Sequence, residues 1–274
     1  MKILAVGDFH GRVPKGLNSF LKENPVDAIV CDGDLADADK IRDMQWKNWD
    51  KIKRKGDFEK LFKSKEEYVS TYTKTIESMK EPVNFLGNTG IKTFLVYGNA
   101  DFPRNLTKKL KYKKYDSLED YVGYFNNITL MHRRGINFGN HSIIGFSGYR
   151  GSSAKSGGNK KLTESFERHL EKLLSRYRKN AILVTHDAPY NTKIDKVENE
   201  DSPKYGKHMG DEIIRKAIEK YKPVLHICGH MHESQGKERI GRTLVVNPGY
   251  AREGEFALIK MNDKIKTGFC RLNK

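Results

Sequence analysis

Carboxylate, amide and imidazole side chains follow five apolar runs of the sequence, in most cases beside a glycine. The donors are Asp8 and His10 in GDFHG, Asp34 in CDGDLAD, Asn99 in YGNAD, His186 in VTHDAP, and His230 and His232 in CGHMH. Because ligands of an open α/β sheet bind beyond the carboxyl ends of its strands, we expect these side chains to meet at one edge. Each motif alone is a weak signal, whereas their joint occurrence favours a single functional site.

The donor types predict a site for two divalent transition-metal ions. Carboxylate, amide oxygen and imidazole suit manganese, iron, zinc, nickel or cobalt, whereas calcium prefers oxygen donors alone. Asp34 is the predicted bridge, because one carboxylate can hold two cations about 3.5–4 Å apart in two-metal hydrolases. Such a pair lowers the pKa of a shared water to near neutrality and so supplies a hydroxide nucleophile. Manganese is the leading candidate.

The elements that must position these donors are short β-branched runs, each ending in a glycine or a polar cluster. Several of them are unbroken apolar stretches, which is typical of strands covered on both faces. Helical spacing recurs between some of the runs, around Phe166–Leu174 and Ile213–Ile218. The pattern predicts one α/β domain over residues 1–274, with two packed sheets and helices outside. The expected strands lie at 2–7, 27–33, 92–98, 141–148, 181–186, 223–229, 242–249 and 255–261.

A highly charged segment at about 39–85 interrupts this rhythm and predicts a helical insertion. Its apolar residues fall on one helical face at Phe62, Val69, Tyr72, Ile76 and Met79. Trp46 and Trp49 add a bulky apolar edge. The commoner interpretation is that this face packs on the domain, and the alternatives are a cap over the site or a surface for a partner.

The net charge of +16 indicates anionic partners, which include nucleic acid, nucleotides and phosphorylated metabolites. Five of the seven residues from Lys108 to Lys114 are lysine, with Tyr112 and Tyr115 nearby. This run is either a solvated surface or a patch that binds a phosphate backbone and stacks bases.

Three cysteines, Cys31, Cys228 and Cys270, are too few and too scattered for a disulfide framework, and we expect Cys31 and Cys228 to be buried as small apolar residues. The N-terminus lacks the apolar stretch of a signal peptide, and no apolar run is long enough for a membrane span. We therefore expect a cytoplasmic protein with no membrane partner. The sequence does not indicate an oligomeric state.

The ordered set DxH, GD, GN, H and GHxH, from Asp8 to His232, resembles the calcineurin-like metallophosphoesterases. The continuation through NPG at 247–249 and the strand-rich tail are similar to small prokaryotic phosphoesterases and phosphodiesterases of that family. The resemblance implies a four-layer α/β/β/α sandwich of two mixed sheets with outer helices. It also implies that Asp34 joins two ligand sets, with Asp8, His10 and His232 at one ion and Asn99, His186 and His230 at the other. Asn99 is further expected to contact a phosphate oxygen.

One position departs from the family pattern. Many members place a histidine after GN, where it protonates the leaving oxygen, but this chain has Ala100 there. Asp37, which supports that histidine in many members, lacks its expected partner. A replacement donor is either a metal-bound water or His208, and Arg104 is a candidate phosphate clamp because it follows the GN turn. General acid assistance is typically worth about 10²–10⁴-fold, so we expect slow turnover or a good leaving group.

These observations favour a metal-dependent phosphoesterase in which a hydroxide held by both metals attacks a phosphodiester or a phosphomonoester, with the diester preferred. The expected substrate is a small phosphate ester or a nucleotide. Two alternatives remain: a nuclease acting on DNA or RNA, suggested by the basic charge, and a scaffold that keeps the fold without catalysis. A dinucleotide-binding dehydrogenase is excluded, because no GxGxxG follows the first strand.

Overall fold

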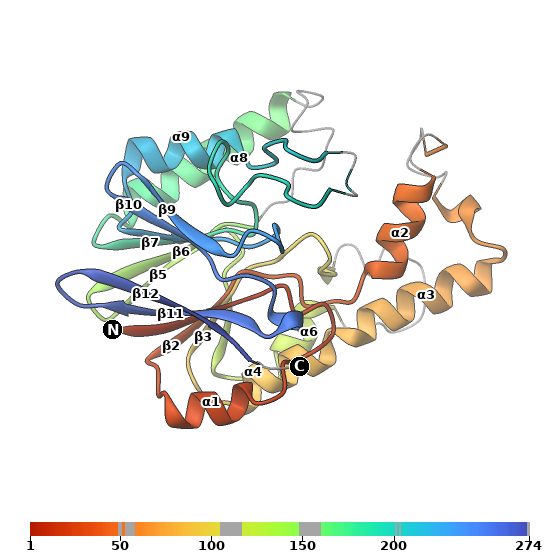
Figure 1. The fold of residues 1–274 in the computed structure, drawn as a ribbon, viewed down its shortest axis with the longest axis horizontal. Helices are drawn as coiled ribbons and strands as arrows, with labels where there is room; N and C mark the ends of the chain where they lie inside the picture. Colours follow the sequence, from red (N-terminus) through yellow and green to blue (C-terminus); the bar gives the residue numbers. More distant parts are fainter. Residues whose placement is uncertain are drawn as a thin grey trace.

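The computed structural model describes residues 1–48, 51–52, 58–104, 117–147, 160–200, 202 and 204–272. Within these ranges the chain forms two six-stranded sheets that pack face to face (Figure 1). The lysine run 108–114, Tyr112, Tyr115 and Trp49 lie outside the described residues. In the described part of the chain, no helix is long and apolar enough to cross a membrane.

The first sheet has the order β12-β11-β1-β2-β3-β4. Strands β1 to β4 run parallel, and β11 and β12 continue the sheet in antiparallel fashion. Its register pairs Val6 with Cys31 and Cys31 with Leu95, so the ends of the first three strands lie level. The strands are β1 (Lys2–Val6), β2 (Ala28–Cys31), β3 (Thr93–Leu95), β4 (Ile128–Leu130), β11 (Glu255–Met261) and β12 (Ile265–Arg271).

The second sheet has the order β5-β6-β7-β8-β10-β9, with antiparallel strands at both edges and four parallel strands between them. Both sheets are therefore mixed. Its strands are β5 (Arg134–Phe138), β6 (His141–Gly145), β7 (Ala181–Val184), β8 (Leu225–Ile227), β9 (Gly236–Ile240) and β10 (Thr243–Asn247).

Three apolar clusters separate four layers. Along β1, Ile3 and Ala5 face the second sheet, whereas Leu4 and Val6 face the helices outside. Both faces of such a strand are buried, which explains its unbroken apolar sequence. The outer face of the first sheet is covered by α1 (Leu17–Glu23), α3 (Lys65–Ser78), α4 (Lys80–Asn88) and α6 (Leu118–Val122), and that of the second by α8 (Lys160–Arg176) and α9 (Glu212–Tyr221). The expected α/β/β/α sandwich is confirmed.

The segment between β2 and β3 divides into two parts. Ile76 of α3, Val83 and Leu86 of α4, and Met79 between the two helices are fully buried, and they belong to the outer helical layer. By contrast, α2 (Asp39–Lys47), the short 3-10 helix η1 (Glu59–Leu61) and the first half of α3 project beyond the strand ends (Figure 1). The buried part of the 39–85 segment thus packs on the domain, and a role of the projecting part as a cap or a partner surface stays a prediction.

The cysteines behave as the sequence indicates. Cys31 and Cys228 are fully buried in separate apolar clusters, and Cys270 is partly buried. All of them carry free thiols. Burial raises the pKa of the Cys31 and Cys228 thiols well above their ordinary value, so neither is a reactive thiolate.

Candidate metal centre

The turns after β1, β2 and β8 hold several donor residues in left-handed backbone conformations. Asp8, His10, Asp34 and His230 have φ angles of 53°, 43°, 54° and 71°. Such angles are uncommon for residues other than glycine. They persist only where the surrounding structure holds the backbone in place, and they cluster at functional sites. The first two turns are joined by hydrogen bonds from Asp8 N to Gly33 O (2.8 Å) and from His10 N to Asp34 O (3.0 Å). The backbone therefore aims these side chains inward at fixed angles.

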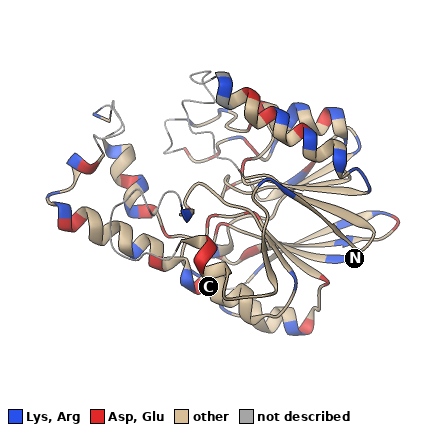
Figure 2. Cartoon of the chain, turned by 180° about the vertical axis from the view of Figure 1, so that it is seen from behind, with Lys and Arg blue, Asp and Glu red and all other residues tan. Residues whose placement is uncertain are grey.

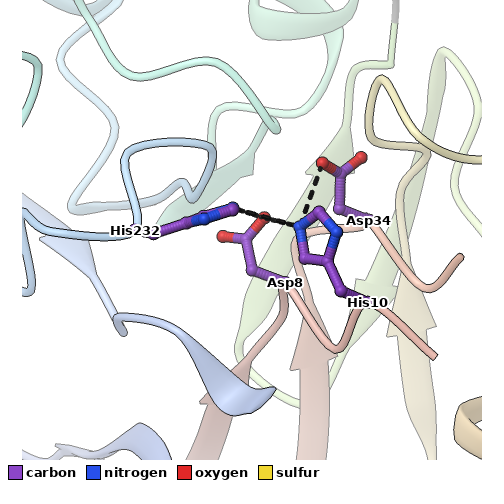
Figure 3. A group of neighbouring side chains, drawn as sticks. All are labelled: Asp8, His10, Asp34 and His232. Atoms are coloured by element: carbon purple, nitrogen blue, oxygen red, sulfur yellow. Dashed lines mark hydrogen bonds and ion pairs between the residues drawn. The ribbon is translucent and has the colours of Figure 1, made fainter. Parts of the chain in front are cut away.

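The first group of donors consists of Asp8, His10, Asp34 and His232, whose nearest ligand atoms all lie within 4.8 Å of one another. His10 Nε2 is 3.1 Å from His232 Nε2 and 3.7 Å from Asp34 Oδ2. Asp8 Oδ1 is 3.4 Å from His232 Nε2. Figure 3 shows these side chains pointing toward one another from three separate loops.

The second group consists of Asp34, His186 and His230. His186 Nε2 is 3.4 Å from Asp34 Oδ2 and 3.3 Å from His230 Nδ1. The same nitrogen is 3.0 Å from Asn99 Oδ1, so Asn99 joins this group. The structure thus brings together all seven side chains that the sequence singles out, and Asp34 is common to both groups.

The chemistry of the donors fits metal ions. Asp8 Oδ1 is buried and has no hydrogen-bond partner among the described residues, although it faces the cluster. Its other oxygen accepts a hydrogen bond from His230 N at 3.0 Å. A buried carboxylate oxygen without a donor is costly, and a divalent cation would satisfy it. Carboxylates and imidazoles at these distances are the donors that transition metals prefer.

Opposite charges at the cluster shift the titration of its members. Burial alone would raise the pKa of Asp34, but the imidazoles of His186 and His10 and the hydrogen bond from Ala100 N together hold the pKa well below its ordinary value. Burial would likewise raise the pKa of Asp8, which His232 lowers instead. Burial opposes charge on His186, yet Asp34 raises its pKa well above the ordinary value. The fold therefore keeps both carboxylates in the ionised form that binds cations.

Two contacts outside the donor groups orient them. His186 Nδ1 lies 2.9 Å from the carbonyl oxygen of Asp32 and donates to it, so Nε2 is the ring nitrogen that would bind a metal in exchange for its proton. Asp101 accepts hydrogen bonds from the backbone nitrogens of Asp34, Leu35 and Gly98 at 2.7–3.0 Å. Burial and the nearby Asp34 raise the pKa of Asp101 to about 6. Asp101, which the motif YGNAD contains, thus fastens the turns after β2 and β3 to each other.

Position 100 contributes through its backbone. Ala100 N donates a hydrogen bond of 2.7 Å to Asp34 Oδ1. The departure from the family pattern therefore removes a side-chain donor but leaves the carboxylate oriented by the main chain.

Asp32 is a neighbour of the centre that the sequence did not single out. It is fully buried, and neither carboxylate oxygen has a hydrogen-bond partner within the described ranges. Burial and the charge of Asp8 raise its pKa well above the ordinary value. A Cβ atom at Gly7 would overlap the Asp32 carboxylate, and one at Gly229 would lie 2.9 Å from Asp32 Oδ1. Gly7 after β1 and Gly229 after β8 thus make room for this acid.

The centre opens into a cleft of about 370 Å³ that α2 borders. Arg42 and Trp46 of α2 line it together with Tyr250. The Tyr250 ring stacks on His232 with centroids 4.2 Å apart and an interplanar angle of 7°. Sequence reasoning missed Tyr250 as a site residue, although it directly follows the NPG motif.

The two remaining candidates lie elsewhere. His208 Nδ1 is 2.7 Å from Asp195 Oδ1, and the described cleft lining includes its neighbour Met209 but not His208. The Arg104 guanidinium pairs with Asp120 Oδ1, and this side chain is 53% exposed. The structure does not bring either residue into the donor groups, and their roles stay predictions.

Comparison with known proteins agrees with this geometry. A family model described as "Metallophosphoesterase, calcineurin superfamily" matches residues 1–269. The chain belongs to the calcineurin superfamily of metallophosphoesterases. The two donor groups that share Asp34 agree with the metal centre expected of a metallophosphoesterase.

Similarity to three individual proteins is either local or low in identity. The uncharacterized protein MJ1162 of Methanocaldococcus jannaschii is 43% identical over 72 residues, which cover 26% of this chain and 31% of that protein. The match thus spans about a third of the relative's length. One solved crystal structure is 21% identical, with a TM-score of 0.69 and coverage of 97% of this chain and 98% of the other. TT1561 of Thermus thermophilus is 17% identical, with a TM-score of 0.52 and 97% coverage of each chain. Both structures share the fold.

Proposed function

We propose that this metallophosphoesterase hydrolyses a phosphate ester at a centre of two divalent cations, with a phosphodiester preferred over a phosphomonoester. The supporting observation is that one buried carboxylate, Asp34, belongs to both donor groups. Two-metal hydrolases hold their two cations with such a shared carboxylate.

Each side chain has a defined task in this proposal. Asp8, His10 and His232 would hold one cation, and His186, His230 and Asn99 the other, with Asp34 between them. Two bound cations supply Lewis acidity toward phosphoryl oxygens and lower the pKa of coordinated water. Manganese is our leading candidate, and iron, nickel, zinc and cobalt suit the same nitrogen and oxygen donors. Asn99 would also donate its amide N–H to a phosphate oxygen.

Protonation of the leaving group needs a donor other than position 100. His208 is our candidate, because the buried carboxylate of Asp195 fixes its Nδ1 and leaves Nε2 to exchange protons. Arg104 is our candidate phosphate clamp, for which it would have to release Asp120. Esters with good leaving groups should therefore react fastest.

Turnover of bis-p-nitrophenyl phosphate with manganese, nickel, cobalt, magnesium and zinc tests the proposal. We expect activity with at least one transition metal. Asp34→Asn should lower this activity by more than about 100-fold, which exceeds the usual effect of replacing a residue that only supports a metal ligand. Asp263→Asn, in the exposed turn between β11 and β12, is the matched control and should keep full activity. Absence of turnover with every metal would instead favour a non-catalytic scaffold.

A further inference from the structure

One wall of the cleft carries a large apolar side chain in contact with water. Trp46 of α2 is 58% exposed, yet it lines the same cleft as His10, Asp34 and His232. An exposed indole is ordinary on a protein surface when it stands alone. Beside a set of metal-binding side chains it offers a flat apolar surface to whatever the centre binds.

A cation accompanies the indole. The Arg42 guanidinium carbon lies 5.6 Å from the centre of the Trp46 ring. Arg42 Nη2 is 2.8 Å from Asp39 Oδ1, and Arg42 Nε is buried with no hydrogen-bond partner among the described residues. The pair thus combines an aromatic face with a guanidinium beside it, which suits a ring attached to an anionic group.

Specific contacts hold this wall in place relative to the metal centre. Arg252 Nη1 is 2.6 Å from Asp39 Oδ2, at the first residue of α2. Arg252 lies two residues after Tyr250, whose ring stacks on His232. The start of α2 is therefore tied to the segment that packs on His232. This contact fixes the place of α2 beside the cleft that Arg42 and Trp46 line.

We propose that α2 recognises the nucleobase of a nucleotide substrate, which stacks on Trp46 while Arg42 contacts its negatively charged part. This inference rests on the proposed function, because the phosphate must lie at the metal centre when the base reaches α2. The cleft of about 370 Å³ falls in the range of small-molecule sites. Base stacking on an aromatic side chain tolerates every base, so affinity should depend on the presence of a base more than on its identity.

Binding of AMP and of ribose 5-phosphate to the manganese-loaded protein tests this proposal. The chain has two tryptophans, so the Trp49→Phe variant leaves Trp46 as the only indole fluorophore. AMP should quench its fluorescence in a saturable manner, whereas ribose 5-phosphate should not. AMP should also inhibit hydrolysis of bis-p-nitrophenyl phosphate at a concentration about 10-fold lower than ribose 5-phosphate, as a stacked base predicts.

Variants separate recognition from folding. Trp46→Ala should abolish the preference for AMP, and Trp46→Phe should retain most of it. Tyr124→Ala removes another exposed aromatic side chain, outside the described cleft lining, and should leave the preference unchanged. Equal binding of the two probes to the wild type, or a preference that survives in Trp46→Ala, would overturn the inference. Either result is compatible with turnover of bis-p-nitrophenyl phosphate, so it would leave the proposed function standing. Failure of turnover with every metal would remove the proposed function, and fluorescence would still report AMP binding.

Discussion

At the scale of single residues, the centre depends on buried carboxylates whose partners are fixed by the main chain. Asp34 receives a hydrogen bond from Ala100 N, and its own backbone nitrogen donates to Asp101. The donor types could be recognised from the sequence, because carboxylates and imidazoles are common metal ligands. Asp32 and Tyr250 could not be recognised, because burial of an acid without a partner and stacking of a tyrosine on His232 leave no pattern in a sequence.

Replacement of Asp101 by Asn tests the link between the turns and the centre. The amide keeps one acceptor oxygen, so at least one of the three backbone N–H groups loses its partner. We expect Asp101→Asn to lower the free energy of unfolding by about 1–3 kcal/mol and metal affinity by about 10–100-fold. Urea denaturation and calorimetric titration with manganese would measure both. Unchanged metal affinity would show that Asp101 does not orient the donors.

His226 gives a prediction for pH dependence. It is fully buried, and Thr185 Oγ1 donates to Asp187 O, so His226 Nε2 must donate to Thr185 Oγ1 at 2.8 Å. Burial lowers the pKa of His226 to about 3. The folded state therefore stays neutral there while the unfolded state takes up a proton near its ordinary pKa of about 6.5.

Stability from His226 is thus present above about pH 6.5 and is lost as the pH falls toward about 3, by about 1.4 kcal/mol per unit. His226→Gln keeps an N–H donor but does not titrate, so its unfolding free energy should fall less steeply between pH 6 and pH 4. Urea denaturation of both proteins with a chelator present gives the two slopes. Parallel slopes would mean that His226 takes up its proton in the folded state.

At the scale of elements, the predicted strands are the inner strands of the two sheets. The eight expected runs correspond to β1, β2, β3, β6, β7, β8, β10 and β11, all of them inside the sheets as described. The strands that the sequence analysis did not predict are β4, β5, β9 and β12, which are the edges of the two sheets. Edge strands face water, so β9 (GKERI) and β12 (IKTGFCR) carry polar residues and give no apolar run. The short helices α1 and α6 were likewise too short for helical periodicity.

A substitution in the turn after β1 tests how tightly this turn packs against the end of β2. A methyl group at Gly7 would overlap the buried Asp32 carboxylate. We expect Gly7→Ala to destabilise the fold by about 1–3 kcal/mol, the usual cost of overpacking, and to weaken metal binding. Gly268→Ala in β12 is the matched control, because a Cβ atom there has open space. Thermal unfolding of both variants would contradict the account if Gly7→Ala were as stable as the control.

At the scale of the whole molecule, both sheets contribute to one site. Asp8, Asp34 and Asn99 follow strands of the first sheet, and His186, His230 and His232 follow strands of the second. No pattern in the sequence states that two sheets pack with their carboxyl ends on the same side. The strand-end positions predict only that the donors meet at one edge, and the family resemblance added the four-layer arrangement. The apolar cluster between the sheets holds them together.

The charge of the molecule bears on the nuclease alternative. Lysine and arginine are spread over the outer helices among acidic residues, and the formal net charge is +16 (Figure 2). If nucleic acid binds through the lysine run outside the described residues, Lys109→Ala, Lys111→Ala and Lys113→Ala together should reduce the slope of log affinity against log salt by about 2–3. Fluorescence anisotropy with a labelled single-stranded oligonucleotide at several salt concentrations measures this slope. An unchanged slope would count against a nuclease that uses this run.

The most direct measurement is anomalous diffraction from crystals of the protein grown with manganese. We expect two peaks about 3.5–4 Å apart, both within bonding distance of the Asp34 carboxylate. One peak should also contact Asp8, His10 and His232, and the other Asn99, His186 and His230. A single peak, or two ions bound away from Asp34, would contradict the account.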